Sequence, residues 1–444
     1  MSAPVIVPRA EHSISRMQID PDALRVLYRL HEHNHVAYLV GGSVRDLLLG
    51  RRPKDFDIGT SAHPYQVKRL FRNCWIIGRR FRLAHIKFGT KTIEVATFRR
   101  QLSPQELAAA DAQSPHGIPI GRAAGDDHVR LLHRDNTFGT PEEDAFRRDF
   151  TINALFYDIG SFSIIDYTGG LGDLHGRLIR SIGDPAERVV EDPVRMLRAV
   201  AMAARLDFTI DPPTEAAIAA HRTEIAKSAP ARLIEELYKL LRSGAAERAF
   251  RMLAERRLLE PIAAPLQKCA GDALWRSLAA LDAYRLRFET APDTLTNAVL
   301  LGSLLVPLGG ASGVLAPHRV LSGDREPAPS LGMLPLARRD VDRLRQVLGL
   351  ERRLLDMGLS PRARRALMHR GPFQEALAWL EIHGQVPEVV EHWRGFVEAA
   401  GTFEAESAEG AEAPAPHRRR RRRRRRRRPF TAHETPSHRD TEKK

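Results

Sequence analysis

Cysteine is scarce in this chain, which carries only Cys74 and Cys269 among its 444 residues. Two cysteines cannot form the disulfide framework that stabilises small secreted domains, so we expect a reducing compartment. The first residues also lack the basic, apolar and small-residue order of a secretion signal, because Pro4 and Pro8 interrupt them. The sequence therefore predicts a cytoplasmic protein.

Long apolar runs are also lacking. The stretch 298–317 carries no charge, but Pro307 and several glycines interrupt it and would make a poor membrane-spanning helix. We therefore expect a buried helix that ends near Pro307, and no membrane partner.

Positive charge is plentiful but concentrated near the carboxyl end. The formal net charge is +14, and the unbroken arginine run 418–428 supplies eleven of these charges, which leaves +3 for the rest. The segment 401–444 has little to bury, so we expect a disordered tail. Adjacent guanidinium groups in such number cannot all be paired within the protein, and nucleic-acid phosphates are their commonest partner. A solvated tract without function is the alternative.

The patterning along the chain predicts roughly two to four structural units. Short β-rich runs alternate with glycine turns between residues 39 and 160, which indicates an α/β or α+β head. From Pro193 onward apolar residues recur at helical spacing, so we expect an all-helical second half. The strands expected in the head are 37–40, 56–58, 92–97 and 152–157, and clear helical patterns cover 233–241, 250–259 and 344–355.

The densest chemical signal is the pair of segments LVGGSVRD at 39–46 and KDFDI at 54–58. They predict a strand, a glycine turn, a short helix and a second strand. Without side chains at Gly41 and Gly42, backbone N–H groups can approach an anion, and a helix that begins near Ser43 directs its positive end to the same place. Such a turn suits a triphosphate.

Paired carboxylates follow this turn. Asp55 and Asp57 are two apart on a presumed strand, so both project from one face while Phe56 points into the core. This arrangement can hold two Mg²⁺ ions for in-line nucleotidyl transfer. Glu94, in the expected strand 92–97, is the candidate third carboxylate. Taken alone, Asp55 and Asp57 would be interpreted as part of a solvated turn, and Glu94 as an exposed residue of a strand. The adjacent glycine turn favours the catalytic interpretation.

At this point the residues resemble a known superfamily. Gly42-Ser43, followed after eleven residues by Asp55-Phe56-Asp57, is similar to the signature of polymerase-beta nucleotidyltransferases. Residues 39–58 resemble the class II branch, which contains bacterial tRNA nucleotidyltransferases and poly(A) polymerases. The resemblance implies an α+β fold, with a small mixed or antiparallel sheet in the head, all-helical neck and body domains, and a disordered basic tail. The implied boundaries are 1–24 for an N-terminal extension, 25–165 for the catalytic head, 166–240 for the nucleotide-selecting and RNA-binding neck, 241–400 for the RNA-binding body and 401–444 for the tail.

Two further segments resemble family motifs in the expected order. The segment EDAFRRDFTINAL at 143–155 is similar to the Arg-Arg-Asp motif, in which Asp149 would belong to the active site and Arg148 and Asn153 would contact ribose and triphosphate. Asp149 and Asn153 are four apart and would share a face of a helix. An ordinary charged helix start would have the same composition.

The segment 182–199 is similar to the helix that selects the incoming base. Asp192, Arg195 and Arg198 succeed one another at intervals of three, so they would lie roughly on one helix face and could pair with the edge of a base. A salt-bridged helix without function is the alternative. The resemblance further implies that Gly41, Gly42 and Arg45 hold the triphosphate.

Other segments favour the poly(A) polymerase side of this family. The loop GRRFRLAHI at 78–86 resembles the form found in that branch, as do residues 6–12 and the arginine tail. The loop cations could grip the RNA primer or the triphosphate, with Phe81 as a stacking surface. The segment 101–132 matches no family motif. The cations expected to bind RNA are Arg79, Arg80, Arg82, Arg418, Arg419, Arg420, Arg421, Arg422, Arg423, Arg424, Arg425, Arg426, Arg427 and Arg428.

The resemblance implies template-independent polyadenylation of RNA 3′ ends. The RNA hydroxyl would attack the α-phosphate of ATP, with two Mg²⁺ ions on Asp55 and Asp57, and with Asp149 and Glu94 completing the acidic site. Mn²⁺ could substitute for Mg²⁺ on the same ligands. A role in mRNA processing and decay, with RNA-decay proteins as partners, is a further implication. CCA addition to tRNA is the runner-up, and a non-catalytic RNA-binding protein is the rival that the intact carboxylates argue against.

Overall fold

The structure, a computed structural model, describes residues 3–78, 82–100, 137–312, 314 and 328–409. The predictions for Arg79, Arg80, Phe81, the segment 101–132 and the arginines 418–428 lie outside these residues. Contacts divide the chain into the units Met1–Val390 and Glu391–Lys444. The finer division into head, neck, body and tail stays a prediction.

In the described part of the chain, eight strands form a mixed sheet in the head, with β3 and β6 parallel and the other neighbours antiparallel. The expected small mixed or antiparallel sheet is therefore confirmed. In spatial order the strands are β1 (Val5–Val7), β10 (Ser163–Asp166), β9 (Leu155–Asp158), β2 (Ala37–Val40), β3 (Ile58–Thr60), β6 (Lys91–Thr97), β5 (Leu83–Phe88) and β4 (Cys74–Ile77).

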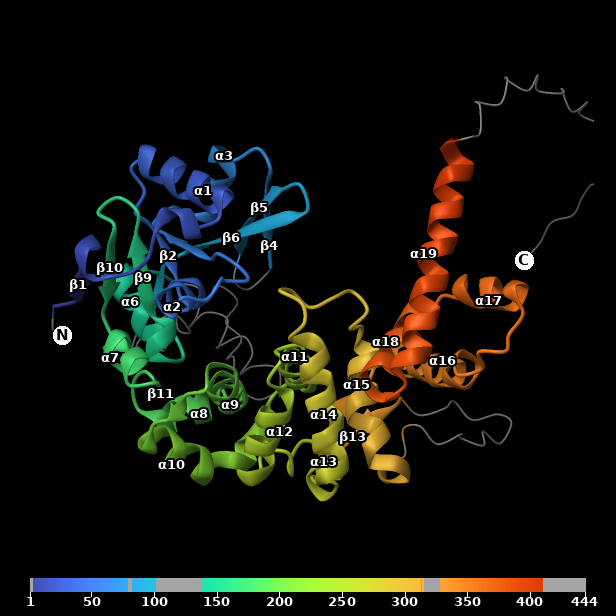
Figure 1. The fold of residues 1–444 in the computed structure, drawn as a ribbon. Coiled ribbons are helices and arrows are strands. Elements are labelled where there is room, and N and C mark those ends of the chain that lie inside the picture. Colours follow the sequence, from blue (N-terminus) through green and yellow to red (C-terminus); the bar gives the residue numbers. More distant parts are fainter. Residues whose placement is uncertain (1–2, 79–81, 101–136, 313, 315–327, 410–444) are drawn as a thin grey trace, which may run out of the picture. The chain divides into compact units, whose positions relative to one another are not determined.

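Two helices cover one face of this sheet. Figure 1 shows α1 (Pro21–Glu32) and α3 (Pro64–Leu70) on the same side of strands β2, β5 and β6. The register places Leu39, Ile58 and Val95 side by side, and all three are buried. Because side chains alternate along a strand, the residues next to them face the opposite side.

The opposite face is covered over the half of the sheet that contains β2, β9 and β10. Val40, Phe156 and Ile165 pack there with Phe98 and with Ala145 of helix α6 (Pro141–Arg147). Asp57 and Glu94 belong to this same face by register, beyond the packed cluster. The sheet thus separates a structural side from the side that carries the acidic residues.

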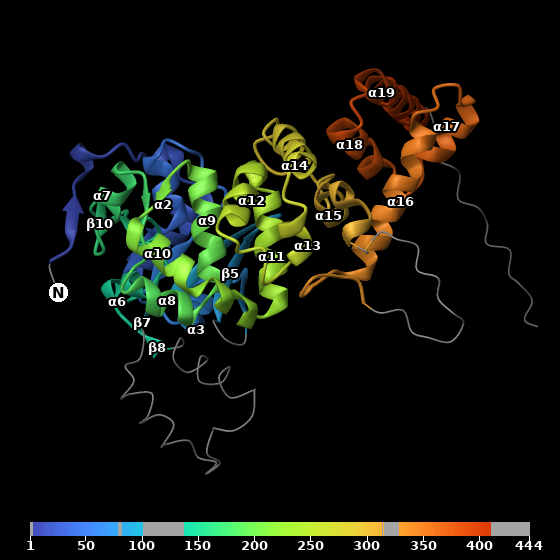
Figure 2. The same ribbon diagram turned by 90° about the horizontal axis from the view of Figure 1, so that it is seen from below.

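Apart from α2, which lies within the head, the remaining described helices follow the head strands along the chain. Figures 1 and 2 agree in placing α8 and α9 beside the head. The helices are α2 (Gly42–Leu48), α7 (Gly170–His175), α8 (Pro185–Glu191), α9 (Val194–Leu206), α10 (Pro212–His221), α11 (Pro230–Leu241), α12 (Ala246–Glu255), α13 (Ala264–Lys268), α14 (Asp272–Arg285), α15 (Asn297–Leu305), α16 (Arg338–Leu354), α17 (Pro361–Met368), α18 (Phe373–His383) and α19 (Pro387–Glu409).

Several expected elements are confirmed. Strand β2 has the predicted bounds, and β6 begins one residue early. Helix α11 covers its predicted pattern and α16 ends one residue short of its pattern, whereas α12 ends at Glu255, four residues before the predicted end. Helix α15 is buried along almost its whole length and ends two residues before Pro307, as expected. Among the described residues, no helix is long and apolar enough to span a membrane.

Other expectations need correction. The second half also contains short strands, β12 (Thr209–Ile210) paired with β11 (Leu178–Ile179), and the hairpin β13 (Ser330–Leu331) and β14 (Leu334–Pro335). In the head, a separate antiparallel pair joins β7 (Arg99–Arg100) and β8 (Thr137–Phe138). Helix α19 continues to Glu409, into the segment expected to be disordered, because its alanines and glutamates favour helix.

His383 is the most perturbed histidine among the described residues. It lies on α18, its Nε2 is 3.0 Å from the hydroxyl of Ser303, and its ring lies 4.2 Å from that of Trp379. Burial lowers the pKa of His383 to about 4. The folded protein therefore holds this imidazole neutral at pH values where an unfolded chain would protonate it.

We predict that His383→Gln flattens the pH dependence of stability. An unfolded histidine titrates near pH 6.5, so wild-type stability falls as pH decreases from about 6.5 towards 4, by about 3 kcal/mol at most. The glutamine removes this linkage while keeping a polar group near Ser303. Urea unfolding of both proteins from pH 7.5 to 4.5 measures it, and parallel pH profiles would contradict the assignment.

Candidate active site

The glycine turn lies between β2 and α2. Gly41 has φ +70° and donates its N–H to the carbonyl of Leu155 at 3.0 Å. A Cβ placed at Gly41 would lie 2.8 Å from Nη1 of Arg148. Only glycine therefore keeps this backbone conformation and lets a guanidinium group lie against the turn.

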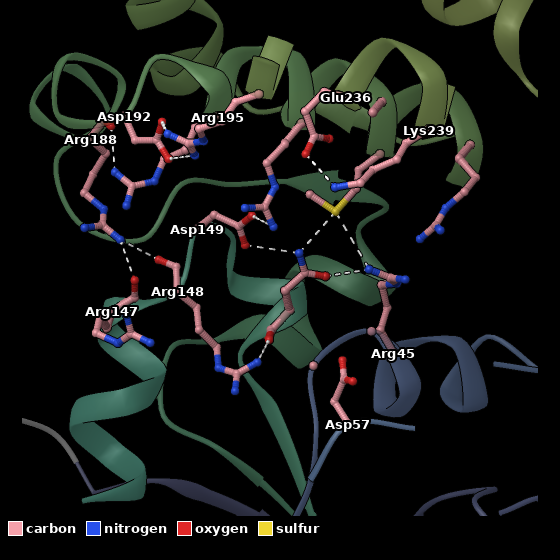
Figure 3. A pocket seen from close by; sticks show the side chains of 18 of the residues that line it. Arg45, Asp57, Arg147, Arg148, Asp149, Arg188, Asp192, Arg195, Glu236 and Lys239 are labelled. Atoms are coloured by element: carbon pink, nitrogen blue, oxygen red, sulfur yellow. Dashed lines mark hydrogen bonds and ion pairs between the residues drawn. The ribbon is translucent and has the colours of Figure 1, made fainter. Parts of the chain in front are cut away.

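A pocket of about 830 Å³ opens beside this turn. Its walls come from the head and from helices α8, α9 and α11, and Figure 3 shows their side chains pointing into a common space. Most of the predicted site residues are thus brought together. Those that line the pocket are Gly41, Gly42, Arg45, Asp57, Arg148, Asp149, Asn153, Asp192, Arg195 and Arg198.

The paired carboxylates precede a strand instead of lying within it. Strand β3 begins at Ile58, one residue after Asp57, so the expected strand 56–58 is wrong at its start. The carbonyl of Asp57 still accepts from Val40 N–H at 3.0 Å, which holds it extended beside β2. Because Ile58 pairs with Val95, Asp57 lies next to Glu94 on the neighbouring strand.

Negative charge accumulates around Asp57. Asp57 lines the pocket and is exposed to solvent there, although neighbouring protein atoms lie close around its carboxyl. Burial, then the carboxylates of Glu94 and Asp55, raise the pKa of Asp57 to about 6, against the opposing charge of Arg148. The Asp55 side chain is 72% exposed, with Lys54 Nζ at 3.9 Å. Glu94 is half exposed and lies 3.6 Å from His85.

This donor set fits a hard divalent cation. Carboxylate oxygens are ligands that Mg²⁺ prefers, and Mg²⁺ usually takes only one or two carboxylates, completing its shell with water and phosphate oxygens. Among the described residues, no three acidic, histidine or cysteine side chains converge into a complete cage. Asp55 and Asp57 are the residues that would hold such a cation, and Asp57 is the one that lines the pocket.

Two arginines face the glycine turn. Arg148 donates from Nε and Nη2 to Asp144 at 3.2 and 2.9 Å, and from Nη1 to the carbonyl of Asn153 at 3.1 Å. Arg45 donates to the side chains of Asn153 and of Asp46. Both guanidinium groups are held in place before any phosphate arrives.

Asp149 holds the wall opposite the glycine turn. It is buried, pairs with Nη2 of Arg198 at 2.6 Å, and accepts from Asn153 Nδ2 at 3.2 Å and from the Phe150 N–H at 2.8 Å. Burial would raise its pKa, but the charge of Arg198 and these hydrogen bonds outweigh it and lower the pKa of Asp149.

The sequence predicted that Asp149 and Asn153 share one face of a helix. The two side chains do meet, but no helix runs from 149 to 153. Helix α6 ends at Arg147, and Asn153 closes a short 3-10 helix that begins at Thr151. The chain turns at this point and still brings the two side chains within hydrogen-bonding distance.

The predicted base-reading residues lie where two helices meet. The expected common helix face is wrong for Asp192, which is the first of two residues between α8 and α9, whereas Arg195 and Arg198 lie on α9. Arg232 of α11 donates to both carboxylate oxygens of Asp192, at 3.0 and 2.8 Å. Arg195 donates to Glu191 and to the carbonyl of Arg188, each at 2.8 Å. In Figure 3 Asp192 and Arg195 lie together at one end of the pocket, away from Asp57.

Sequence reasoning missed several pocket residues. Arg188 donates to the carbonyls of Arg147 and Arg148 at 3.0 and 2.6 Å, and so joins α8 to the Arg-Arg-Asp segment. Arg205 and Arg232 also line the pocket. Arg188 stands inside a matched motif and could have been flagged, but the partner of Arg232 is forty residues away and spacing gives no signal for it. Arg82 is exposed and is not among the residues lining the pocket.

Three family models match the chain in order. A "Poly A polymerase head domain" matches residues 37–180, a "Probable RNA and SrmB- binding site of polymerase A" matches 207–269, and a "Polymerase A arginine-rich C-terminus" matches 331–428. Together they cover the head, part of the helical region and the arginine run.

Individual proteins show the same relationship. Poly(A) polymerase I of Salmonella typhi is 49% identical over 257 residues, which are 58% of this chain and 53% of that protein. A CCA-adding enzyme of Lactobacillus johnsonii is 36% identical over 240 residues, 54% of each chain. The matches thus span about half the length of these curated relatives.

Solved structures show the same fold. The crystal structure of the Bacillus stearothermophilus CCA-adding enzyme in complex with CTP is similar with a TM-score of 0.59 and 28% identity, over 86% of this chain and 83% of that one. The resemblance inferred from the motifs is confirmed.

We predict that Arg198→Met destabilises the protein because it leaves Asp149 buried without its cation. Breaking a buried pair costs about 3–5 kcal/mol; Arg198 is half exposed, so about 2–3 kcal/mol is expected. Urea unfolding at pH 7.5 measures the loss.

The double variant Asp149→Asn with Arg198→Met is the matched control. It removes both charges, so it should recover most of the lost stability. A single Arg198→Met variant as stable as the wild type would show that the pair does not organise this wall.

Proposed function

Because the chain belongs to the poly(A) polymerase and tRNA nucleotidyltransferase family, we propose that it is a template-independent RNA adenylyltransferase. It transfers AMP from ATP to the 3′-hydroxyl of RNA and releases pyrophosphate. The observation that carries the proposal is one pocket lined by a side-chain-free turn, by the carboxylate of Asp57, and by two prepositioned side chains, Asp192 and Arg195, that can read a base. No single-purpose binding module needs all three.

The triphosphate is held at the glycine turn. Gly41 and Gly42 let phosphate oxygens approach the backbone, and Arg45 and Arg148 lie on the same side of the turn. Since both guanidinium groups already have partners, little side-chain entropy is lost when the nucleotide binds. Asn153 lies between the two arginines, within reach of the ribose side.

The carboxylates serve the transfer step. Mg²⁺ bound by Asp55 and Asp57 would stabilise the attacking oxygen and the departing pyrophosphate, and Mn²⁺ could replace it. The RNA 3′-hydroxyl gives up its proton to water as its oxygen bonds to the α-phosphorus. The bond from that phosphorus to the bridging oxygen breaks, and pyrophosphate leaves with that electron pair. Glu94 adds negative charge beside Asp57, and Asp149 orders the opposite wall through Arg198.

The base is read at the far end of the pocket. Asp192 can accept from the exocyclic amino group of adenine, and Arg195 can donate to the adjacent ring nitrogen. Arg232 and Glu191 fix these two side chains, and Arg198 reaches the same wall. Amino-acid side chains thus take the place of a template strand.

We further propose that RNA 3′ ends are the acceptor, that the helical region and the arginine run contribute RNA affinity, and that the protein works in cytoplasmic mRNA processing and decay, with RNA-decay proteins as partners. CCA addition to tRNA is the second candidate. The 36% identity to a CCA-adding enzyme favours it over unrelated activities, but the higher 49% identity to a poly(A) polymerase makes polyadenylation the leading proposal.

Primer extension separates the two candidates. We predict long ladders with ATP and Mg²⁺ on an unstructured RNA, and little extension with CTP, GTP or UTP. A tRNA lacking its CCA end is the comparison substrate. CTP-dependent addition that stops after three nucleotides on the tRNA would make the protein a CCA-adding enzyme; no incorporation on either RNA would refute both.

We predict that Asp55→Asn with Asp57→Asn lowers AMP transfer by about a thousandfold or more, because metal-assisted charge stabilisation is worth several kcal/mol. RNA affinity, measured by fluorescence anisotropy, should stay within about twofold, since binding comes from other surfaces. Asp22→Asn, which removes a partly buried carboxylate on α1 paired with the exposed Arg25, is the control and should leave transfer unchanged. Normal transfer by the double variant would refute the site assignment.

A further inference from the structure

Half of the acidic side of the head sheet is left open among the described residues. On strands β4, β5 and β6, the side chains that point to the same side as Asp57 follow from the register, in which Trp75 pairs with His85 and His85 with Glu94. We call this surface the open face. It consists of Trp75, Ile77, Leu83, His85, Lys87 and Glu94.

The open face exposes apolar side chains. Trp75 is 51% exposed and Ile77 is 48% exposed, on the edge strand β4. The other three tryptophans of the chain, Trp275, Trp379 and Trp393, are 8% exposed or less. An indole exposed to this degree costs hydration free energy unless a ligand covers it.

The open face is also continuous with the catalytic pocket. Leu83 of β5 lines that pocket, and its cross-strand partner is Ile77 of β4. From the other side, Glu94 lies beside Asp57 and 3.6 Å from His85, the cross-strand neighbour of Trp75. A chain that leaves the carboxylates in this direction therefore crosses Trp75.

A cationic side chain, that of Lys87, lies over the exposed Trp75 ring. Nζ of Lys87 lies 5.4 Å from the centre of the Trp75 ring, and the Lys87 side chain is exposed. An aromatic plane with an adjacent cation is the arrangement that binds single-stranded nucleic acid, because the ring stacks on a base and the cation meets the phosphate. An apolar protein partner would gain nothing from Lys87.

We propose that the open face holds the RNA segment immediately upstream of the reacting 3′ end, with one base stacked on Trp75 and Lys87 beside the adjoining phosphate. This inference rests on the proposed function, because it takes the 3′ end to lie at Asp57. Stacking is tolerant of sequence, since every base offers a π-face. The open face would thus retain any primer end without reading it.

Tryptophan fluorescence tests the proposal directly, because Trp75 is the one well-exposed tryptophan of the four. Titration of the full-length protein with an oligoadenylate of about ten nucleotides, without ATP, should quench and shift the Trp75 emission. In Trp75→Leu the quench should disappear. If RNA changes neither the intensity nor the wavelength of the emission, the proposal is overturned. It is also overturned if the emission changes only with protein concentration, because a second copy of the protein would then cover Trp75.

Kinetics separate stacking from a structural role. Trp75→Leu should raise KM for RNA about tenfold or more while KM for ATP changes by less than about twofold, and Trp75→Phe, which keeps a stacking plane, should restore most of the RNA affinity. Lys87→Met should raise KM for RNA and weaken its salt dependence. Equal KM values for RNA in the wild type and Trp75→Leu would refute the role of Trp75.

Tyr65→Leu is the matched control. Tyr65 is 61% exposed, on α3, which covers the other face of the sheet, so its loss should leave RNA binding unchanged. Equal losses in both variants would point to a general effect on the head. If RNA quenches the emission but no nucleotide is transferred to any RNA, the proposed function fails and the RNA-binding role of the open face stands. If nucleotide is transferred but transfer does not depend on Trp75, the proposed function stands and the role of the open face fails.

Discussion

The parallel pairing of β3 with β6 is the constraint on which the rest of the site depends. It sets Ile58 against Val95 in the buried face, and thereby puts Asp57 and Glu94 side by side on the other. A slip of one residue in either strand would invert that strand, turning its carboxylate towards α1 and α3 and its buried apolar residue to the opposite face. The hydrophobic effect that drives Ile58 inward therefore also brings Asp57 to the pocket, with Glu94 beside it.

Charge in the pocket is balanced by local partners before any substrate binds. Arg148 is held by Asp144, Arg198 by Asp149 and Arg195 by Glu191, while Asp57 is left with like-charged neighbours that raise its pKa. Among the pocket residues named here, negative charge without a close cationic partner is therefore found at Asp57. This asymmetry favours a cation beside Asp57 and anionic phosphate beside the turn.

How much of this could be predicted depends on the range of the interaction. The turn at Gly41, strand β2 and helix α15 follow from local pattern, and the motifs placed Asp57, Arg148 and Asp192 in one site. Sequence could not show that Arg232 grips Asp192, because that contact joins residues forty apart through tertiary packing. The helix expected across 149–153 failed because the chain turns after α6, while a side-chain hydrogen bond preserved the predicted proximity.

Exposure of Trp75 was equally invisible to sequence, since β4 is apolar at all of its positions and no alternation tells which face is covered. Helices α1 and α3 take one face, and the cluster around Phe156 covers only the far half of the other. An edge strand that shows an indole and an isoleucine is a hazard for aggregation, which proteins ordinarily remove with charge. Here Lys87 sits over the ring while the ring itself is kept, which is the expected compromise if a transient, phosphate-bearing ligand needs that surface.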